Sequence, residues 1–63
     1  MNRIRERRVE LKLTRKELAN RIGTTQTSIF RYENGTRNVP LKKMVAIADA
    51  LGCKVDDLIV KEE

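Results

Sequence analysis

The chain has 63 residues, 40% of them hydrophobic and 37% charged, with a formal net charge of +5. A chain of this length is expected to form one domain over residues 1–63, with a core too thin to enclose a substrate cleft. It has no histidine, one cysteine and no apolar stretch of the roughly 20 residues that a membrane span requires. These features argue against an enzyme, a metal or cofactor site, an internal disulfide and a membrane protein.

The charge is unevenly distributed along the chain. Residues 1–37 hold ten Lys or Arg and four Glu, a net charge of +6, whereas residues 38–63 hold four Lys and five Asp or Glu, a net charge of −1. A polyanionic partner facing the first half explains this asymmetry, and so does a merely solvated charged surface. The start of the chain lacks the apolar run of a secretory signal, and the lone Cys53 suits a reducing compartment, so we expect a cytoplasmic protein.

Hydrophobic spacing predicts five helices and no strand. The first helix is expected over about residues 2–12, with Ile4 and Leu11 on one apolar face. The second begins after Thr14, which is followed three residues later by Glu17 in the pattern of a capping box. Gly23 is expected to end this helix, because glycine adopts a positive φ without strain.

The remaining helices are separated by clear turn signals. The third is expected over about residues 25–33, with Thr24 as its N-cap, and Asn34-Gly35 marks the loop that follows. The fourth begins near Pro40, which the first turn of a helix tolerates. Its apolar face is predicted to consist of Leu41, Met44, Ile47, Ala48 and Leu51, and a short last helix is marked by Val55, Leu58 and Ile59.

The segment from about residue 15 to 34 has the spacing of a helix-turn-helix. In this motif two helices cross steeply over a short turn, so it needs a small residue where the backbones approach and a permissive one in the turn. Ala19 and Gly23 meet these needs, and Ile29 can anchor the second helix on the first. Three more positions agree with the pattern: Leu18, Ile22 and Tyr32.

Four segments carry a family resemblance: LTRKELA at 13–19, IGTTQ at 22–26, IFRYENG at 29–35 and IADALG at 47–52. Through them the chain resembles the phage repressor/Cro-like, or Xre-type, transcriptional regulators over about residues 4–59. The resemblance implies an all-α, compact five-helix domain of the lambda-repressor type, in a prokaryotic or phage-encoded protein at the nucleoid. It also implies a homodimer that binds double-stranded DNA at a two-fold operator and regulates transcription, here predicted to be a repressor.

The third helix is predicted to supply the base-reading side chains. A helical wheel places Thr27 and Arg31 opposite the inward Ile29, and Gln26 lies in the first turn, the end that enters the major groove. Gln can pair bidentately with adenine, Arg with guanine, and Thr can touch a thymine methyl group. Phe30 is also exposed on the wheel, so it either contacts a thymine methyl group or folds against a neighbouring element.

Contacts to DNA phosphates are expected from helix starts and from the loop after the third helix, because free N–H groups and the positive end of the helix dipole attract anions. The predicted residues are Arg15, Lys16, Thr25, Asn34, Thr36, Arg37 and Asn38.

Two charged residues are predicted to form a structural pair. Arg8 lies on the inward face of the first helix, and Glu33 lies about 40° from Ile29 on the third helix, at 100° per residue. An inward charge is costly unless it is paired, so we predict an Arg8–Glu33 ion pair. The family resemblance supports the same match.

The C-terminal segment has more apolar residues than a small core needs from its last turn. We expect Val55 and Leu58 to face inward and Ile59 and Val60 to face a partner subunit. A helix-turn-helix that binds only proteins is the main alternative. We expect regulation by abundance, or by a partner protein that docks on the C-terminal half of the chain.

Overall fold

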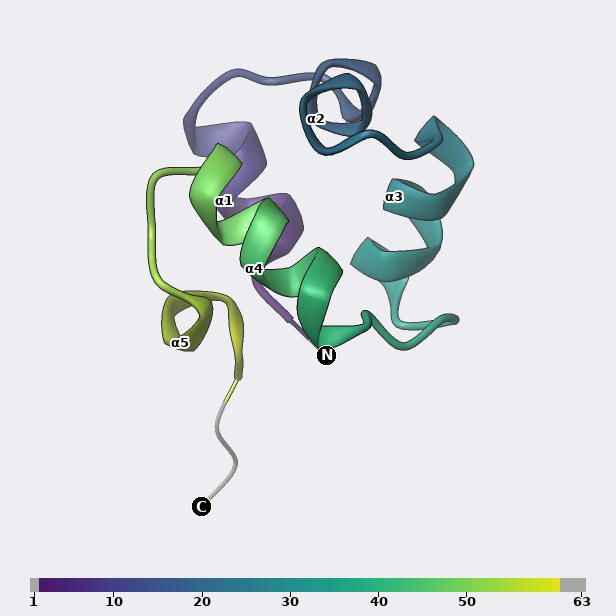
Figure 1. The fold of residues 1–63 in the computed structure, drawn as a ribbon. Helices are drawn as coiled ribbons and strands as arrows, with labels where there is room; N and C mark the ends of the chain where they lie inside the picture. The colour runs from purple at the N-terminus through teal and green to yellow at the C-terminus, as the bar shows by residue number, and fades with distance from the viewer. Residues whose placement is uncertain (1, 61–63) are drawn as a thin grey trace.

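The computed structural model describes residues 2–60, in which five helices follow one another along the chain (Figure 1). They are α1 (Ile4–Glu10), α2 (Arg15–Ile22), α3 (Gln26–Asn34), α4 (Leu41–Ala50) and α5 (Val55–Leu58). No strand forms within the described residues, where an isolated antiparallel bridge joins Asn2 to Ile59. None of these helices is long and apolar enough to cross a membrane. The predicted all-α, five-helix fold is confirmed.

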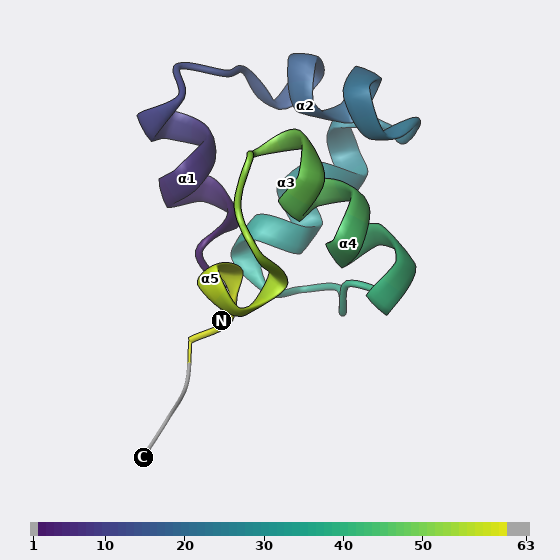
Figure 2. The same cartoon turned by 60° about the vertical axis from the view of Figure 1, so that its left-hand side comes forward.

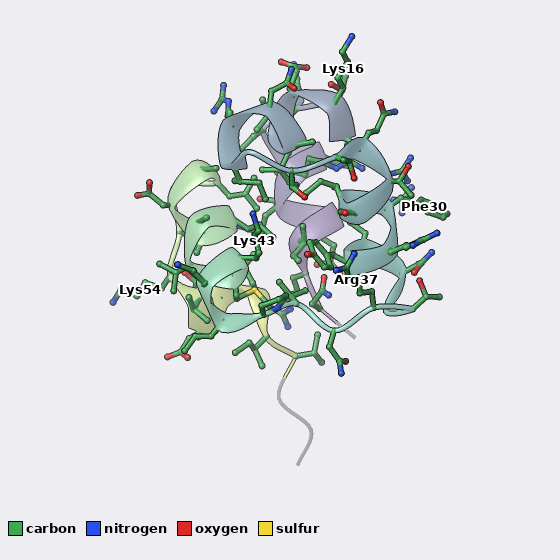
Figure 3. The ribbon with its side chains drawn as sticks, turned by 45° about the vertical axis from the view of Figure 1, so that its right-hand side comes forward. Lys16, Phe30, Arg37, Lys43 and Lys54 are labelled. Carbon is green, nitrogen blue, oxygen red and sulfur yellow. The ribbon has the colours of Figure 1, made fainter. Side chains whose placement is uncertain are left out.

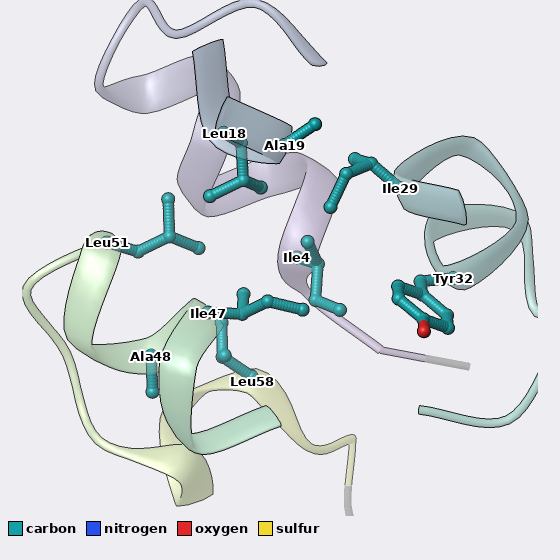
Figure 4. Packing of buried hydrophobic residues seen from close by; sticks show 9 residues of the cluster. All are labelled: Ile4, Leu18, Ala19, Ile29, Tyr32, Ile47, Ala48, Leu51 and Leu58. Carbon is teal, nitrogen blue, oxygen red and sulfur yellow. The ribbon is translucent and has the colours of Figure 1, made fainter. Parts of the chain in front are cut away.

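All five helices contribute to one hydrophobic core, since none is long enough to be stable alone. The view in Figure 2 places α2 above α3 and α4, and α5 below them; α2 packs against both α3 and α4. The side chains of the buried hydrophobic residues point towards one another between the helices, as Figure 4 shows. The buried hydrophobic residues are Ile4, Leu18, Ala19, Ile29, Tyr32, Ile47, Ala48, Leu51 and Leu58.

The start and the end of α2 form as predicted. The Thr14 hydroxyl accepts a hydrogen bond from the Glu17 N–H, and the Thr14 N–H donates to the Glu17 carboxylate, both at 3.0 Å. Gly23 takes the left-handed conformation with a φ of 72°, and its N–H and that of Thr24 donate to the Ala19 carbonyl. This closed end lets α3 begin after a very short turn.

The first helix is shorter than predicted, and this changes the position of Leu11. Because α1 ends at Glu10, Leu11 no longer follows the helical periodicity of Ile4 and is 50% exposed. Lys12 then takes a φ of 57°, a left-handed conformation that turns the chain towards α2. The expectation that Leu11 shares the apolar face of Ile4 is therefore wrong.

Three further local predictions are wrong. Thr25, not Thr24, is the N-cap of α3, because its hydroxyl accepts from the Ser28 N–H at 3.1 Å, so the helix starts and ends one residue later than predicted. Leu41 is 74% exposed, since it lies about 120° around α4 from the buried Ile47. Ile59 follows α5 instead of belonging to it.

The capping box makes α2 sensitive to acid. The backbone N–H of Thr14, and then its side chain, hold the pKa of Glu17 below its ordinary value of 4.5. A carboxylate with a lowered pKa stabilises the fold above its unfolded pKa, and this stabilisation is lost as the pH falls through its folded pKa. We expect Glu17→Gln to be less stable than wild type at pH 7, and the difference to shrink below pH 4.5. Urea unfolding of both proteins across this pH range measures the difference in their free energies of unfolding. A difference that does not change with pH would contradict a stabilising role for the ionised Glu17 carboxylate.

Candidate nucleic-acid interface

The third helix presents one face to the core and the other to solvent. Ile29 and Tyr32 are buried and anchor α3 on the rest of the domain. The predicted base-reading residues are all exposed: Thr27 and Arg31 lie opposite Ile29, and Phe30 and Gln26 lie on the flank of that face. Figure 3 shows Phe30 projecting from α3 away from the body of the domain. The structure thus brings the four residues together on one accessible surface.

The start of α3 is built by its own capping residue. The Thr25 hydroxyl accepts from the Ser28 N–H and donates to the Ser28 hydroxyl at 3.0 Å. Gln26 is the first residue of the helix, so its backbone N–H is one of those without a partner inside the helix. The Thr25 hydroxyl already donates its hydrogen to the Ser28 hydroxyl. The free backbone N–H groups at the start of α3 are therefore better placed than this hydroxyl to donate to a phosphate.

The loop after α3 is ordered by local contacts among the predicted phosphate-binding residues. The Asn34 side-chain oxygen accepts from the Thr36 N–H at 3.0 Å and from the Thr36 hydroxyl at 2.7 Å. The Arg37 guanidinium lies 5.8 Å from the centre of the Tyr32 ring. Asn38 is exposed at the far end of the loop. Lys16, at the start of α2, is exposed as well and points away from the domain (Figure 3).

The ion pair between α1 and α3 has the geometry expected from the sequence. Arg8 Nε donates to one carboxylate oxygen of Glu33 at 2.6 Å and Arg8 Nη2 to the other at 3.3 Å. Arg8 Nη1 donates to the Leu13 carbonyl at 2.7 Å. The two side chains are 9% and 2% exposed, so both charges are removed from water and depend on each other.

A second arginine joins this pair, and the sequence analysis missed its role. Arg15 Nε donates to Glu33 Oε1 at 3.0 Å, and the Arg15 guanidinium lies 5.1 Å from the centre of the Phe30 ring. Glu33 therefore bridges arginines from α1 and α2. The ring of Phe30 stays 48% exposed while Arg15 covers one of its faces, so Phe30 contacts a neighbouring helix in part, and its contact with a thymine methyl group stays a prediction. A helical wheel has no signal for such a contact between separate helices.

The residues predicted to contact DNA include four cations and no acidic side chain: Arg15, Lys16, Arg31 and Arg37. No buried side-chain nitrogen or oxygen within residues 2–60 lacks a hydrogen-bond partner. The same part of the chain contains no cluster of three His, Cys, Asp or Glu that could hold a metal ion. The arrangement is suited to donating hydrogen bonds to an anionic, hydrogen-bond-accepting partner, which is what a DNA groove presents.

Two helices joined by a tight turn, the second with an exposed polar face, define a helix-turn-helix domain. The helix-turn-helix family profile matches residues 4–58. The chain belongs to this family of DNA-binding transcriptional regulators, of the Xre or Cro/C1 type.

Individual relatives agree with this assignment. An uncharacterized HTH-type transcriptional regulator from Methanothermobacter thermautotrophicus is 41% identical over 61 residues, covering 95% of this chain and 88% of that protein. Another from Archaeoglobus fulgidus is 34% identical over 61 residues, covering 97% and 86%. The cryptic phage CTXphi transcriptional repressor RstR from Vibrio cholerae is 32% identical over 62 residues, covering 98% of this chain and 56% of the repressor.

The buried pair predicts a large effect on stability. Glu33→Ala would leave the buried Arg8 without its counter-charge, so we expect a loss of about 3–5 kcal/mol in the free energy of unfolding. Glu10→Ala is the matched control, because Glu10 pairs with Arg7 at 3.6 Å on the surface and should cost no more than about 0.5 kcal/mol. Urea titration of both variants provides the comparison, and equal losses would refute a special role for Glu33.

Proposed function

We propose that the protein is a sequence-specific repressor that binds a palindromic operator in double-stranded DNA as a homodimer, with α3 in the major groove. One observation carries this proposal: α3 is anchored through Ile29 and Tyr32, while its opposite face exposes base-reading side chain types. No catalytic residue, cofactor or metal takes part. Such a protein acts at the nucleoid in the cytoplasm.

The chemistry of the exposed face favours direct reading of bases. Gln26 pairs with adenine, Arg31 with guanine, and Thr27 and Phe30 offer apolar contact to thymine methyl groups. Each bidentate pair discriminates against the wrong base by about 1–3 kcal/mol. The residues proposed to hold the backbone phosphates fix the orientation of α3: Arg15, Lys16, Thr25, Asn34, Thr36, Arg37 and Asn38.

Repression is favoured over activation by similarity. The relative from Vibrio cholerae is named a transcriptional repressor, and it matches almost the whole of this chain. A small domain that occupies an operator can repress by blocking access to the DNA, which requires no further contact surface.

Selection of bound sequences from a random duplex pool at about 150 mM salt tests the proposal, because weak long-range attraction is screened there. We expect an enriched palindrome with half-site centres about 34 Å apart. Gln26→Ala should lose the preference at one A·T position by about 5- to 150-fold, the equivalent of 1–3 kcal/mol. Asn20→Ala, which removes an exposed amide from α2, is the control. No enrichment by the wild type would instead favour a protein partner.

The proposed dimer contact lies on the less charged half of the chain. Ile59 and Val60 are exposed apolar residues beside α5, in a segment where the net charge is −1. Ile59 also bridges to Asn2 and lines a hollow with Arg37, so a contact here would lie beside the loop that follows α3. Exposed apolar side chains that become buried in an interface supply most of its affinity.

We expect the double substitution Ile59→Asp and Val60→Asp to weaken binding to the selected palindrome about 10-fold or more, the equivalent of about 1.4 kcal/mol, while binding to a single half-site is unchanged. Leu11→Asp is the matched control, because Leu11 is also an exposed apolar residue but lies after α1. Titration of labelled full-site and half-site duplexes measures the difference. Equal weakening on both duplexes would argue against a dimer through this surface.

A further inference from the structure

A surface hollow of about 250 Å³ lies where α1, α2 and α3 meet. It is lined by Arg5, Arg15, Phe30, Glu33 and Asn34. A neighbouring hollow of about 260 Å³ is lined by Arg15, Gln26, Thr27 and Phe30. The two hollows share Arg15 and Phe30, so the first adjoins the base-reading surface on the side of α1. Arg5 has no role in the interface described above.

The walls of the first hollow carry an excess of positive charge. Glu33 is its only acidic residue, and both oxygens of this carboxylate accept hydrogen bonds from Arg8 and Arg15. Arg5 is exposed, and it takes part in no ion pair within residues 2–60. Because two arginines already balance Glu33, the charge of Arg5 adds to a net positive site that favours an anion.

Arg15 is held in a position suited to grip such an anion. Its Nε is engaged by Glu33, and its guanidinium lies over the Phe30 ring. Neither of its terminal nitrogens donates a hydrogen bond within residues 2–60, so their N–H groups are available for a bidentate contact with phosphate oxygens. A side chain that is already fixed loses less entropy on binding.

Asn34, the remaining polar residue that lines the hollow, supplies a hydrogen-bond donor as well. The Asn34 oxygen accepts both hydrogen bonds from Thr36, which leaves the Asn34 NH₂ group as the end that can donate to a phosphate. The hollow therefore combines donors from three helices and has no acceptor that is not already engaged. This donor set matches a phosphate, which only accepts hydrogen bonds.

We infer that this hollow binds a single phosphate of the DNA backbone, gripped jointly by Arg5 from α1 and Arg15 from α2. The inference rests on the proposed function, to which it adds Arg5 as a phosphate-binding residue. Contact from α1 would fix the position of α3 along the groove from a helix outside the helix-turn-helix itself.

The first experiment compares Arg5→Ala with Arg3→Ala in the full chain. Both residues are exposed arginines at α1, and Arg3 is not among the residues that line the hollow. Binding to a duplex is measured from 50 to 200 mM salt. Arg5→Ala should reduce the magnitude of the log–log slope by about 0.9, so that its affinity falls about 3.5-fold less than that of wild type over this range. Arg3→Ala should keep the slope of wild type.

The second experiment locates the phosphate. Each phosphate of the duplex is replaced in turn by a neutral methylphosphonate, and binding is measured for wild type, Arg5→Ala and Arg15→Ala. Arg15→Ala keeps the Arg8–Glu33 pair, so the domain should remain folded. We expect wild type to lose affinity on replacement of one particular phosphate, and both variants to lose less affinity than wild type on that same replacement.

Several outcomes would overturn the inference. Equal slopes for Arg5→Ala and Arg3→Ala, or loss of sensitivity at two different phosphates, would exclude a joint grip while leaving DNA binding intact. Inorganic phosphate that shifts the NMR signals of the Arg5 and Arg15 side chains, with unchanged duplex binding in both variants, would identify a site for the free anion instead. A wild-type protein without salt-dependent duplex binding would overturn this inference and the proposed function together.

Discussion

The arrangement of the first three helices depends on one buried carboxylate. The side chain of Glu33, on α3, is 2% exposed and accepts hydrogen bonds from arginines of α1 and α2. Removing a charge from water is costly, and the cost is offset only when the partners have good geometry. Since the hydrophobic core of so short a chain is thin, this network restricts how α3 can be oriented more sharply than apolar packing alone would.

The same network joins the fold to the surface proposed to bind DNA. Arg15 donates to Glu33 and covers Phe30, so a residue at the interface is also part of the support of α3. Rigid support matters because base-reading side chains must keep their geometry to within a fraction of an ångström to discriminate. The capping box at Thr14 and the left-handed Gly23 fix the two ends of α2, and thereby the place from which Arg15 reaches α3.

Whether a feature of the fold or of the candidate site can be predicted from the sequence depends on how far apart along the chain the interacting residues lie. The Thr14–Glu17 box, the turn at Gly23 and the inward position of Tyr32 depend on neighbours within one or two helical turns, so their spacing in the sequence predicts them. Leu11 lies just beyond the end of α1, where a shift of one or two residues changes which side chain is covered. Leu41 is exposed for a different reason, because it lies about 120° around α4 from Ile47. The contact of Arg15 with Glu33 spans 18 positions between two helices, and no periodicity within either helix encodes it. The Arg8–Glu33 pair was predictable because both residues point inward, because a buried charge requires a partner, and because the family resemblance indicates the same match.

The uneven charge of the chain has a structural counterpart in the proposed complex. The basic half contains α1, α2 and α3, which meet at the positive hollow and at the exposed face of α3. The half from residue 38 onward contains α4, α5 and the exposed Ile59 and Val60. Two copies bound to one palindrome each bring a basic half to the DNA, where the phosphates neutralise it, and must meet through another surface. A contact through Ile59 and Val60 would use neither α3 nor the positive hollow, so the proposed dimerisation and the proposed DNA binding involve separate residues.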